Sequence, residues 1–252
     1  DAVVQVGMAA YLLFSPQSQP NAWAVTAVIA LVMLPFSVVG PFVSPILDRH
    51  ARQRVVVVCD LLRMVLAIIM TAMVVTGHAG VAGQAVLLVL LLITLSLNRL
   101  QIAGLSAGMP LTVDSDEYLG AAALMPMLGP LSGMIGGALA GLARLASGRL
   151  LPTNWADGLV FVIASVLFIA AAVTALGFGR GELGPEAGAP VTTWRQVFSG
   201  LTAAGREIVR KRPAALSMIM VFFARVGYGA LMTAIIMLYR HYFGSDADLE
   251  RV

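Results

Sequence analysis

The stretch AVLLVLLLITLSLNRLQIAGLSAG, residues 85–108, is apolar over almost its whole length and carries one charged side chain, that of Arg99. An α-helix rises about 1.5 Å per residue, so this stretch can cross a hydrocarbon layer of roughly 30 Å. A barrel strand would alternate apolar and polar residues over about ten positions, and this stretch does not. It therefore predicts a membrane-spanning helix that holds a guanidinium inside the bilayer.

Runs of the same kind fill most of the chain. Of its 252 residues, 59% are apolar and 12% charged, and the mean hydropathy is +0.90. These values exclude a soluble globule, which needs more polar surface, and a disordered chain, which needs more charge. We expect an all-α, polytopic membrane bundle with a truncated first span. The expected spans are residues 1–14, 22–47, 55–76, 85–108, 118–143, 158–179 and 213–239.

Basic residues near the span ends predict the orientation. The loop DRHARQR after the second span holds Arg49, Arg52 and Arg54. The segment between the sixth and seventh spans holds six more Lys or Arg residues. The positive-inside rule places both on the cytoplasmic side of a cell (inner) membrane, as it does the N-terminal side of the first span.

The long loop between the sixth and seventh spans has two parts. RGELGPEAGAP, residues 180–190, is rich in Gly, Pro and Glu and predicts a flexible linker. After it, apolar residues recur at helical spacing and predict an amphipathic helix on the membrane surface; the alternative is a plain basic linker. The apolar positions are Trp194, Val197, Phe198, Leu201 and Ile208.

Ionisable residues within spans are costly and therefore mark candidate sites. Asp1 and Arg99 lie at similar predicted depths and could neutralise each other or compete for a proton or a cationic substrate. Alternatively they form a static ion pair, or Asp1 is a frayed end. Asp60 and Arg63 are three residues apart on one helix face and predict a structural pair that snorkels to the cytoplasmic interface.

The seventh span has its own charge near the bilayer centre. Arg225 lies there with Tyr228 on the same helix face. Such an arginine faces a wet cavity or an acid on another helix. The alternative is a structural anchor to a helix outside this chain.

The fifth span carries a stripe of glycines. Gly129, Gly133, Gly137 and Gly141 recur every four residues, and Pro126 and Pro130 lie in the same helix. Glycines permit close helix approach, and prolines kink a helix. The pattern favours a surface that bends or seals between two bundles, with tight static packing as the alternative.

The sequence shows no motif for catalysis, metal binding or nucleic-acid binding. The sequence contains no GxxxxGK[ST], HExxH or GxSxG motif, so we expect no enzyme. His50, His78 and His241 lie far apart and predict no metal site, and we expect no cofactor. The basic loop DRHARQR lacks interleaved aromatics, which argues against a nucleic-acid partner.

Three motifs resemble the major facilitator superfamily. GPFVSPILDRHARQR, residues 40–54, is similar to its signature loop between the second and third spans, with Asp48, Arg49, Arg52 and Arg54 at the charged positions. Arg99 with Gly104 is similar to its fourth-span motif, and GPLSG, residues 129–133, to the fifth-span motif of proton-driven exporters. NRLQIAGLSAGMP, residues 98–110, looks like the drug- and siderophore-exporter branch.

The resemblance implies twelve spans in two six-span bundles. Residues 1–179 would form the first bundle, 180–212 the cytoplasmic linker, and 213–252 the first span of the second, whose remainder would be missing. It also implies alternating access about a midplane site. The loop with Asp48 and its arginines would be a cytoplasmic latch, and Arg99 would tune a nearby acid, for which Asp1 is our candidate, with Gln5 one turn along.

The function expected from these features is proton-coupled export of small amphipathic compounds by a monomer in the lipid bilayer. Two alternatives stay open. One is a facilitator or importer of a nutrient or metabolite, against which the GPLSG motif argues. The other is a non-transport membrane scaffold, which would tolerate neutral replacements of Arg99 and Arg225.

Overall fold

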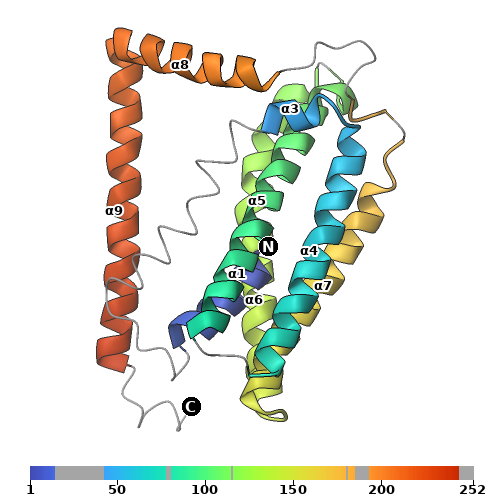
Figure 1. The fold of residues 1–252 in the computed structure, drawn as a ribbon, viewed down its shortest axis with the longest axis vertical. Coiled ribbons are helices and arrows are strands. Elements are labelled where there is room, and N and C mark those ends of the chain that lie inside the picture. The colour runs from blue at the N-terminus through green and yellow to red at the C-terminus, as the bar shows by residue number, and fades with distance from the viewer. Residues whose placement is uncertain (15–42, 78–80, 115, 180, 185–192, 244–252) are drawn as a thin grey trace. The chain divides into compact units, whose positions relative to one another are not determined.

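A computed structural model describes residues 1–14, 43–77, 81–114, 116–179, 181–184 and 193–243 (Figure 1). All regular secondary structure within these ranges is helical, which confirms the predicted all-α class. The helices are α1 (Ala2–Phe14), α3 (Val43–Leu47), α4 (Arg52–Val75), α5 (Val81–Thr112), α6 (Tyr118–Gly148), α7 (Thr153–Ala175), α8 (Trp194–Arg210) and α9 (Arg212–Phe243).

Five of these helices are long and apolar enough to cross a membrane: α4, α5, α6, α7 and α9. They coincide with the third to seventh predicted spans. α1 ends at Phe14, where the first predicted span ends. The second predicted span and the turn before it lie outside the described residues, apart from the short helix α3.

The described helices fall into two compact units. The first contains α1 and α3 to α7, and the second contains α8 and α9. The boundary between them comes at Trp194, where the predicted amphipathic helix begins.

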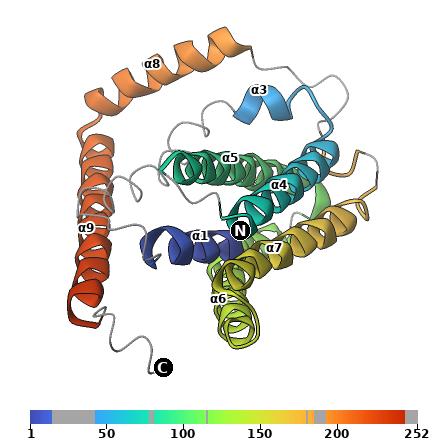
Figure 2. The ribbon, with the colours of Figure 1, turned by 60° about the horizontal axis from the view of Figure 1, so that its bottom comes forward.

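α4 is the central helix of the first unit. It packs mainly against α7 and also against α5, and Figures 1 and 2 show α4 and α7 side by side. α1 packs against α6 and α7. The side chains of Met8, Met70, Leu87 and Phe161, from four different helices, are almost completely buried and form the core of this unit.

Two glycines allow helices of the first unit to approach closely. A Cβ atom at Gly158 of α7 would lie 2.5 Å from a methyl carbon of Val75, at the end of α4. A Cβ atom at Gly7 of α1 would lie 2.9 Å from a methyl carbon of Val160. Both distances are shorter than a carbon–carbon contact allows, so the α4–α7 and α1–α7 contacts depend on these glycines.

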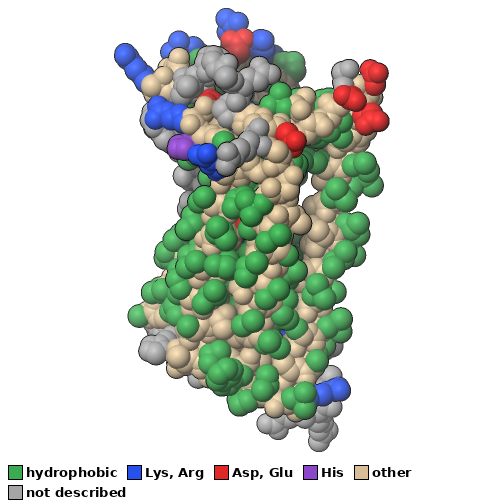
Figure 3. Space-filling view, turned by 90° about the vertical axis from the view of Figure 1, so that its right-hand side faces the viewer, with side chains coloured by type: hydrophobic (Ala, Val, Ile, Leu, Met, Phe, Trp, Pro, Cys, Tyr) green, Lys and Arg blue, Asp and Glu red, His purple; other side chains and the backbone are tan. Residues whose placement is uncertain are grey.

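Large apolar side chains also cover the outside of the bundle. Val58 of α4 is 52% exposed and Val166 of α7 is 58% exposed. On the face in Figure 3, hydrophobic side chains cover the middle, and charged ones gather at the upper end and are sparse at the lower end. This distribution fits a surface that faces lipid in its middle and water at its ends.

We predict that Gly158→Val lowers the stability of the first unit by about 1–3 kcal/mol, because the added methyl groups overlap Val75 and force α4 and α7 apart. The measurement is thermal unfolding of the detergent-purified protein. Gly141→Val is the matched control, since a Cβ atom at Gly141 meets no atom within 4 Å. Equal losses for both variants would contradict the assigned close approach.

Candidate functional site: a buried network around Arg63

Arg63 of α4 joins two carboxylates inside the first unit. Its Nη2 atom lies 3.2 Å from Oδ1 of Asp60 on the same helix and 3.5 Å from Oδ1 of Asp1 at the start of α1. Asp60 is fully buried and Arg63 is 4% exposed. The Asp1 side chain is 25% exposed. The guanidinium therefore links α1 to α4 away from water.

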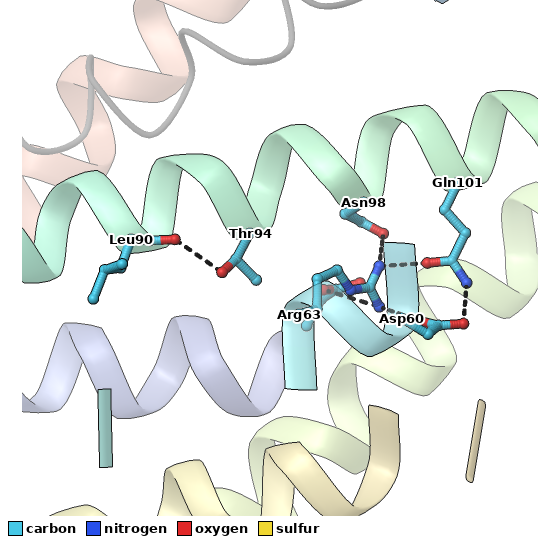
Figure 4. A network of polar contacts seen from close by, with 7 residues as sticks. Asp60, Arg63, Leu90, Thr94, Asn98 and Gln101 are labelled. Atoms are coloured by element: carbon cyan, nitrogen blue, oxygen red, sulfur yellow. Dashed lines mark hydrogen bonds and ion pairs between the residues drawn. The ribbon is translucent and has the colours of Figure 1, made fainter. Parts of the chain in front are cut away.

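Two amide side chains of α5 complete the network (Figure 4). Nη1 of Arg63 donates hydrogen bonds to Oδ1 of Asn98, at 3.4 Å, and to Oε1 of Gln101. The Gln101 amide nitrogen donates in turn to Oδ2 of Asp60, at 2.9 Å. Gln101 thus holds both members of the ion pair and fixes their relative orientation.

An aromatic ring of α7 covers the same guanidinium. The ring centre of Phe168 lies 4.4 Å from Cζ of Arg63, within the range of a cation–π contact. Phe168 is itself buried. Four helices, α1, α4, α5 and α7, therefore meet at one positive charge.

The side chains of this network have an unequal charge balance. Two carboxylates share one guanidinium, so one negative charge is left over when all three groups are ionised. Burying charge is costly unless each group is paired and hydrogen-bonded. Binding of a proton to either carboxylate would balance the charges of these three side chains.

The structure corrects two expectations about these charges. Asp60 and Arg63 do form the predicted pair, but they do not snorkel to the interface, because α4 turns them toward α5 and α7. The guanidinium that contacts Asp1 is that of Arg63, not the expected Arg99. Arg99 is half-buried on α5.

Helix geometry explains why Arg99 is not in the network. Asn98 and Gln101 are three residues apart and share the face of α5 that meets α4. At about 100° per residue, Arg99 is roughly 100° from Asn98 and 160° from Gln101, so it projects from another side of α5. The spacing of the two amides within an apolar run was the sequence signal for this face.

The other predicted cavity residues lie on exposed positions of the described helices. Gln5 is exposed on α1, and its backbone nitrogen donates to the Asp1 carbonyl, at 2.9 Å. Arg225 and Tyr228 are exposed on α9, in the second unit.

The glycine stripe of α6 is largely uncovered. Cβ atoms at Gly129, Gly133 and Gly141 would meet no atom within 4 Å, whereas one at Gly137 would lie 3.6 Å from Val6 of α1. α6 continues as one helix through Pro126 and Pro130. Within the described residues, close static packing is thus confined to the part of the stripe near Gly137.

In the basic loop after the second predicted span, Arg52 has a structural role. Its Nη1 atom donates to the carbonyl oxygens of Ala107 in α5, at 2.8 Å, and Leu183, at 3.1 Å. Its backbone nitrogen donates to the Gly184 carbonyl, at 3.2 Å. Asp48 is half-buried, and Arg49 and Arg54 are exposed. Arg52 therefore fastens the segment after α7 to the ends of α4 and α5.

Two further polar contacts of the first unit were not predicted. The Gln53 amide donates to the Ala175 carbonyl, at 3.3 Å, and to that of Phe178, so it satisfies carbonyl groups at the C-terminal end of α7. Near the opposite end of α7, Arg144 of α6 pairs with the buried Asp157. Among the described residues, no group of three or more His, Cys, Asp or Glu side chains could hold a metal ion.

The chain is similar to two curated proteins. Each is named an uncharacterised MFS-type transporter, one from Mycobacterium bovis and one from Mycobacterium tuberculosis. Both are 31% identical to it over 188 residues, which cover 74% of this chain and 41% of the relative. The chain thus spans about two fifths of the length of these relatives, and the similarity supports the superfamily assignment made from the motifs.

No family model matches the chain. No solved structure matches it either.

We predict that Arg63→Gln destabilises the first unit by about 3–5 kcal/mol, because it leaves two buried carboxylates without their cation. Asp60→Asn should cost less, since Arg63 keeps Asp1 and the asparagine keeps an oxygen that can accept from Gln101. Thermal unfolding of the purified variants measures which of the two substitutions lowers the stability more. A larger loss for Asp60→Asn than for Arg63→Gln would contradict the shared-guanidinium arrangement.

We predict that Arg52→Ala lowers the unfolding temperature, at a cost of about 1–2 kcal/mol, because it removes the donor for the carbonyl groups of Ala107 in α5 and Leu183 after α7. Arg54→Ala, which removes an exposed arginine from the same loop, should change stability by less than about 0.5 kcal/mol. The comparison uses the same thermal unfolding assay, and equal effects would argue against a structural role for Arg52.

Proposed function

We propose that this chain is the first helical bundle, the cytoplasmic linker and the first span of the second bundle of a major facilitator superfamily transporter. Residues 1–179, 180–212 and 213–252 would be these three parts. The transporter would work by alternating access and export small amphipathic compounds across the cell (inner) membrane in exchange for protons. The motifs and the similarity to MFS-type transporters support this proposal.

The observation that carries proton coupling is the Arg63 network. When Asp1 binds a proton, it no longer needs a cation, and the tie between α1 and α4 through Arg63 weakens. When Asp1 loses the proton, the tie reforms. A proton that binds one arrangement of the helices better than another shifts the population between them, which is the requirement for coupling to transport.

Asp1 is a better proton carrier than Asp60. Asp60 is fully buried, forms an ion pair with Arg63 and accepts a hydrogen bond from Gln101, so it has no open side. Asp1 has a longer contact, 3.5 Å, with Arg63, and a quarter of its side chain is exposed. Asp1 is therefore the carboxylate of this network with an open side, and we propose that the proton binds there. Gln5 of the next turn, Arg99, Arg225 and Tyr228 remain our candidates for the substrate cavity.

Two exposed surfaces of the first unit are available to the proposed second bundle. Gly129 and Gly133, with Pro130 between them, present an uncovered strip of α6 on which another helix could pack closely. Asp48, Arg49 and Arg54 would form the cytoplasmic latch, while Arg52 would keep the loop in shape through its bonds to carbonyl groups. We propose a monomer as the transporting unit.

The test is efflux from vesicles that contain the full-length protein, with ethidium as the amphipathic cationic probe and an imposed pH gradient. We expect efflux to depend on the gradient, Asp1→Asn to abolish that dependence, and Asp1→Glu to retain it. Asp116→Asn is the control, because Asp116 is an exposed acid between α5 and α6.

Three outcomes would count against the proposal. Efflux that ignores the gradient removes proton coupling. Coupling that survives Asp1→Asn but not Asp60→Asn moves the proton to Asp60. Counterflow of sugars or amino acids without ethidium efflux favours the facilitator or importer.

A further inference from the structure

α8 has two chemically distinct faces. At about 100° per residue, its apolar side chains occupy an arc of about 140° and its charged and amide side chains the opposite side. Among the apolar residues, Val209 is 80% exposed, Phe198 57% and Leu201 44%. The apolar face is therefore open at Phe198, Leu201 and Val209 within the second unit, while Val197 and Ile208 are half-buried.

The charges of α8 are segregated as well. Arg195, Arg206 and Arg210 project within about 60° of one another on the polar side, next to one edge of the apolar arc. Glu207 projects toward the other edge, where its carboxylate pairs with Arg210, at 3.1 Å, and Lys211, at 3.2 Å. Exposed pairs of this kind are weak. From 194 to 212 the chain holds five Lys or Arg residues and one Glu, so the positive charge is only slightly compensated.

The neighbouring helix fixes where α8 lies along the membrane normal. α9 begins at Arg212, and its first 24 residues are apolar enough to span a membrane. Only Lys211 separates the two helices, and Figure 1 shows a sharp bend between them. The C-terminal end of α8 must therefore start at the membrane surface, and its polar side keeps the rest of it from entering the hydrocarbon.

We propose that α8 is a binding surface for anionic lipid headgroups. Its apolar face enters the boundary between headgroups and acyl chains, and the arginine stripe of Arg195, Arg206 and Arg210 contacts the lipid phosphates. Lys211 and Arg212 extend this basic surface to the start of α9. A helix of this kind binds more strongly as the anionic lipid content rises and more weakly as salt rises. The lipid composition then controls how firmly the start of α9 is held, independently of what the protein transports.

The test places a nitroxide label on either face of α8 in the full-length protein, with Cys59 and every other native cysteine replaced by Ala so that each variant has one cysteine. Val209→Cys reports on the apolar face and Ser199→Cys on the polar face. Collision with oxygen, which partitions into lipid, is compared with collision with a water-soluble nickel complex. The vesicles contain phosphatidylcholine alone or phosphatidylcholine with phosphatidylglycerol.

We expect the label at Val209 to favour oxygen in the phosphatidylglycerol vesicles and to shift toward nickel without that lipid or in high salt. The label at Ser199 should favour nickel throughout. Arg195→Gln with Arg206→Gln should reduce the ratio of docked to undocked helix by about fivefold for each arginine. The control, Arg149→Gln, removes an exposed arginine directly after α6 in the first unit and should leave the ratio unchanged.

Each other outcome overturns the proposal. A label at Val209 that favours nickel in both vesicles means that α8 does not rest on the membrane. A label that neither reagent reaches means that protein covers the face. Equal oxygen preference in both vesicles, or an equal effect of the control variant, means that the arginine stripe does not recognise anionic headgroups.

Discussion

The arrangement of the first unit depends on how one guanidinium is accommodated in an apolar helical bundle. Arg63 cannot reach water from its place on α4, so its charge has to be matched by Asp60, Asp1 and the amides of α5. Matching it brings α1 and α5 to α4, and Phe168 brings α7 to the same point. The polar network therefore specifies the neighbours of α4, whereas apolar packing alone would permit several arrangements.

α4 carries the contacts that organise this unit along its whole length. Arg52 and Gln53 at its beginning satisfy carbonyl groups at the ends of α5 and α7. Asp60 and Arg63 follow about two turns later, and Val75 at its end lies against Gly158. Hydrogen bonds and ion pairs thus hold α4 at its beginning and in its middle, and the close contact with Gly158 holds its end. These contacts fix the register of α4 against α7. α6, by contrast, leaves much of its surface uncovered.

The network also connects structure to the proposed activity. If the charges of the network cancelled, the network would stabilise one arrangement of the helices, and a proton would have little effect on it. Two carboxylates lie on one guanidinium, and we propose that a single proton bound there changes the strength of the tie between α1 and α4. The proposed lipid contact of α8 lies at the opposite extreme, because its charges are exposed and respond to the membrane surface and to salt.

The helices of this chain can be predicted from the amino-acid pattern. Long apolar runs can only be helices in a bilayer, so the third to seventh spans could be predicted, as could the pairing of Asp60 with Arg63 at helical spacing and the helix from Trp194. Which side chains pair between helices could be seen only in the folded structure. Whether Asp1 meets Arg63 or Arg99 depends on the rotation of each helix about its axis and on which helices are adjacent. Apolar residues on nearly every side of these helices leave that rotation undefined in the sequence, because lipid and protein interior accept the same side chains.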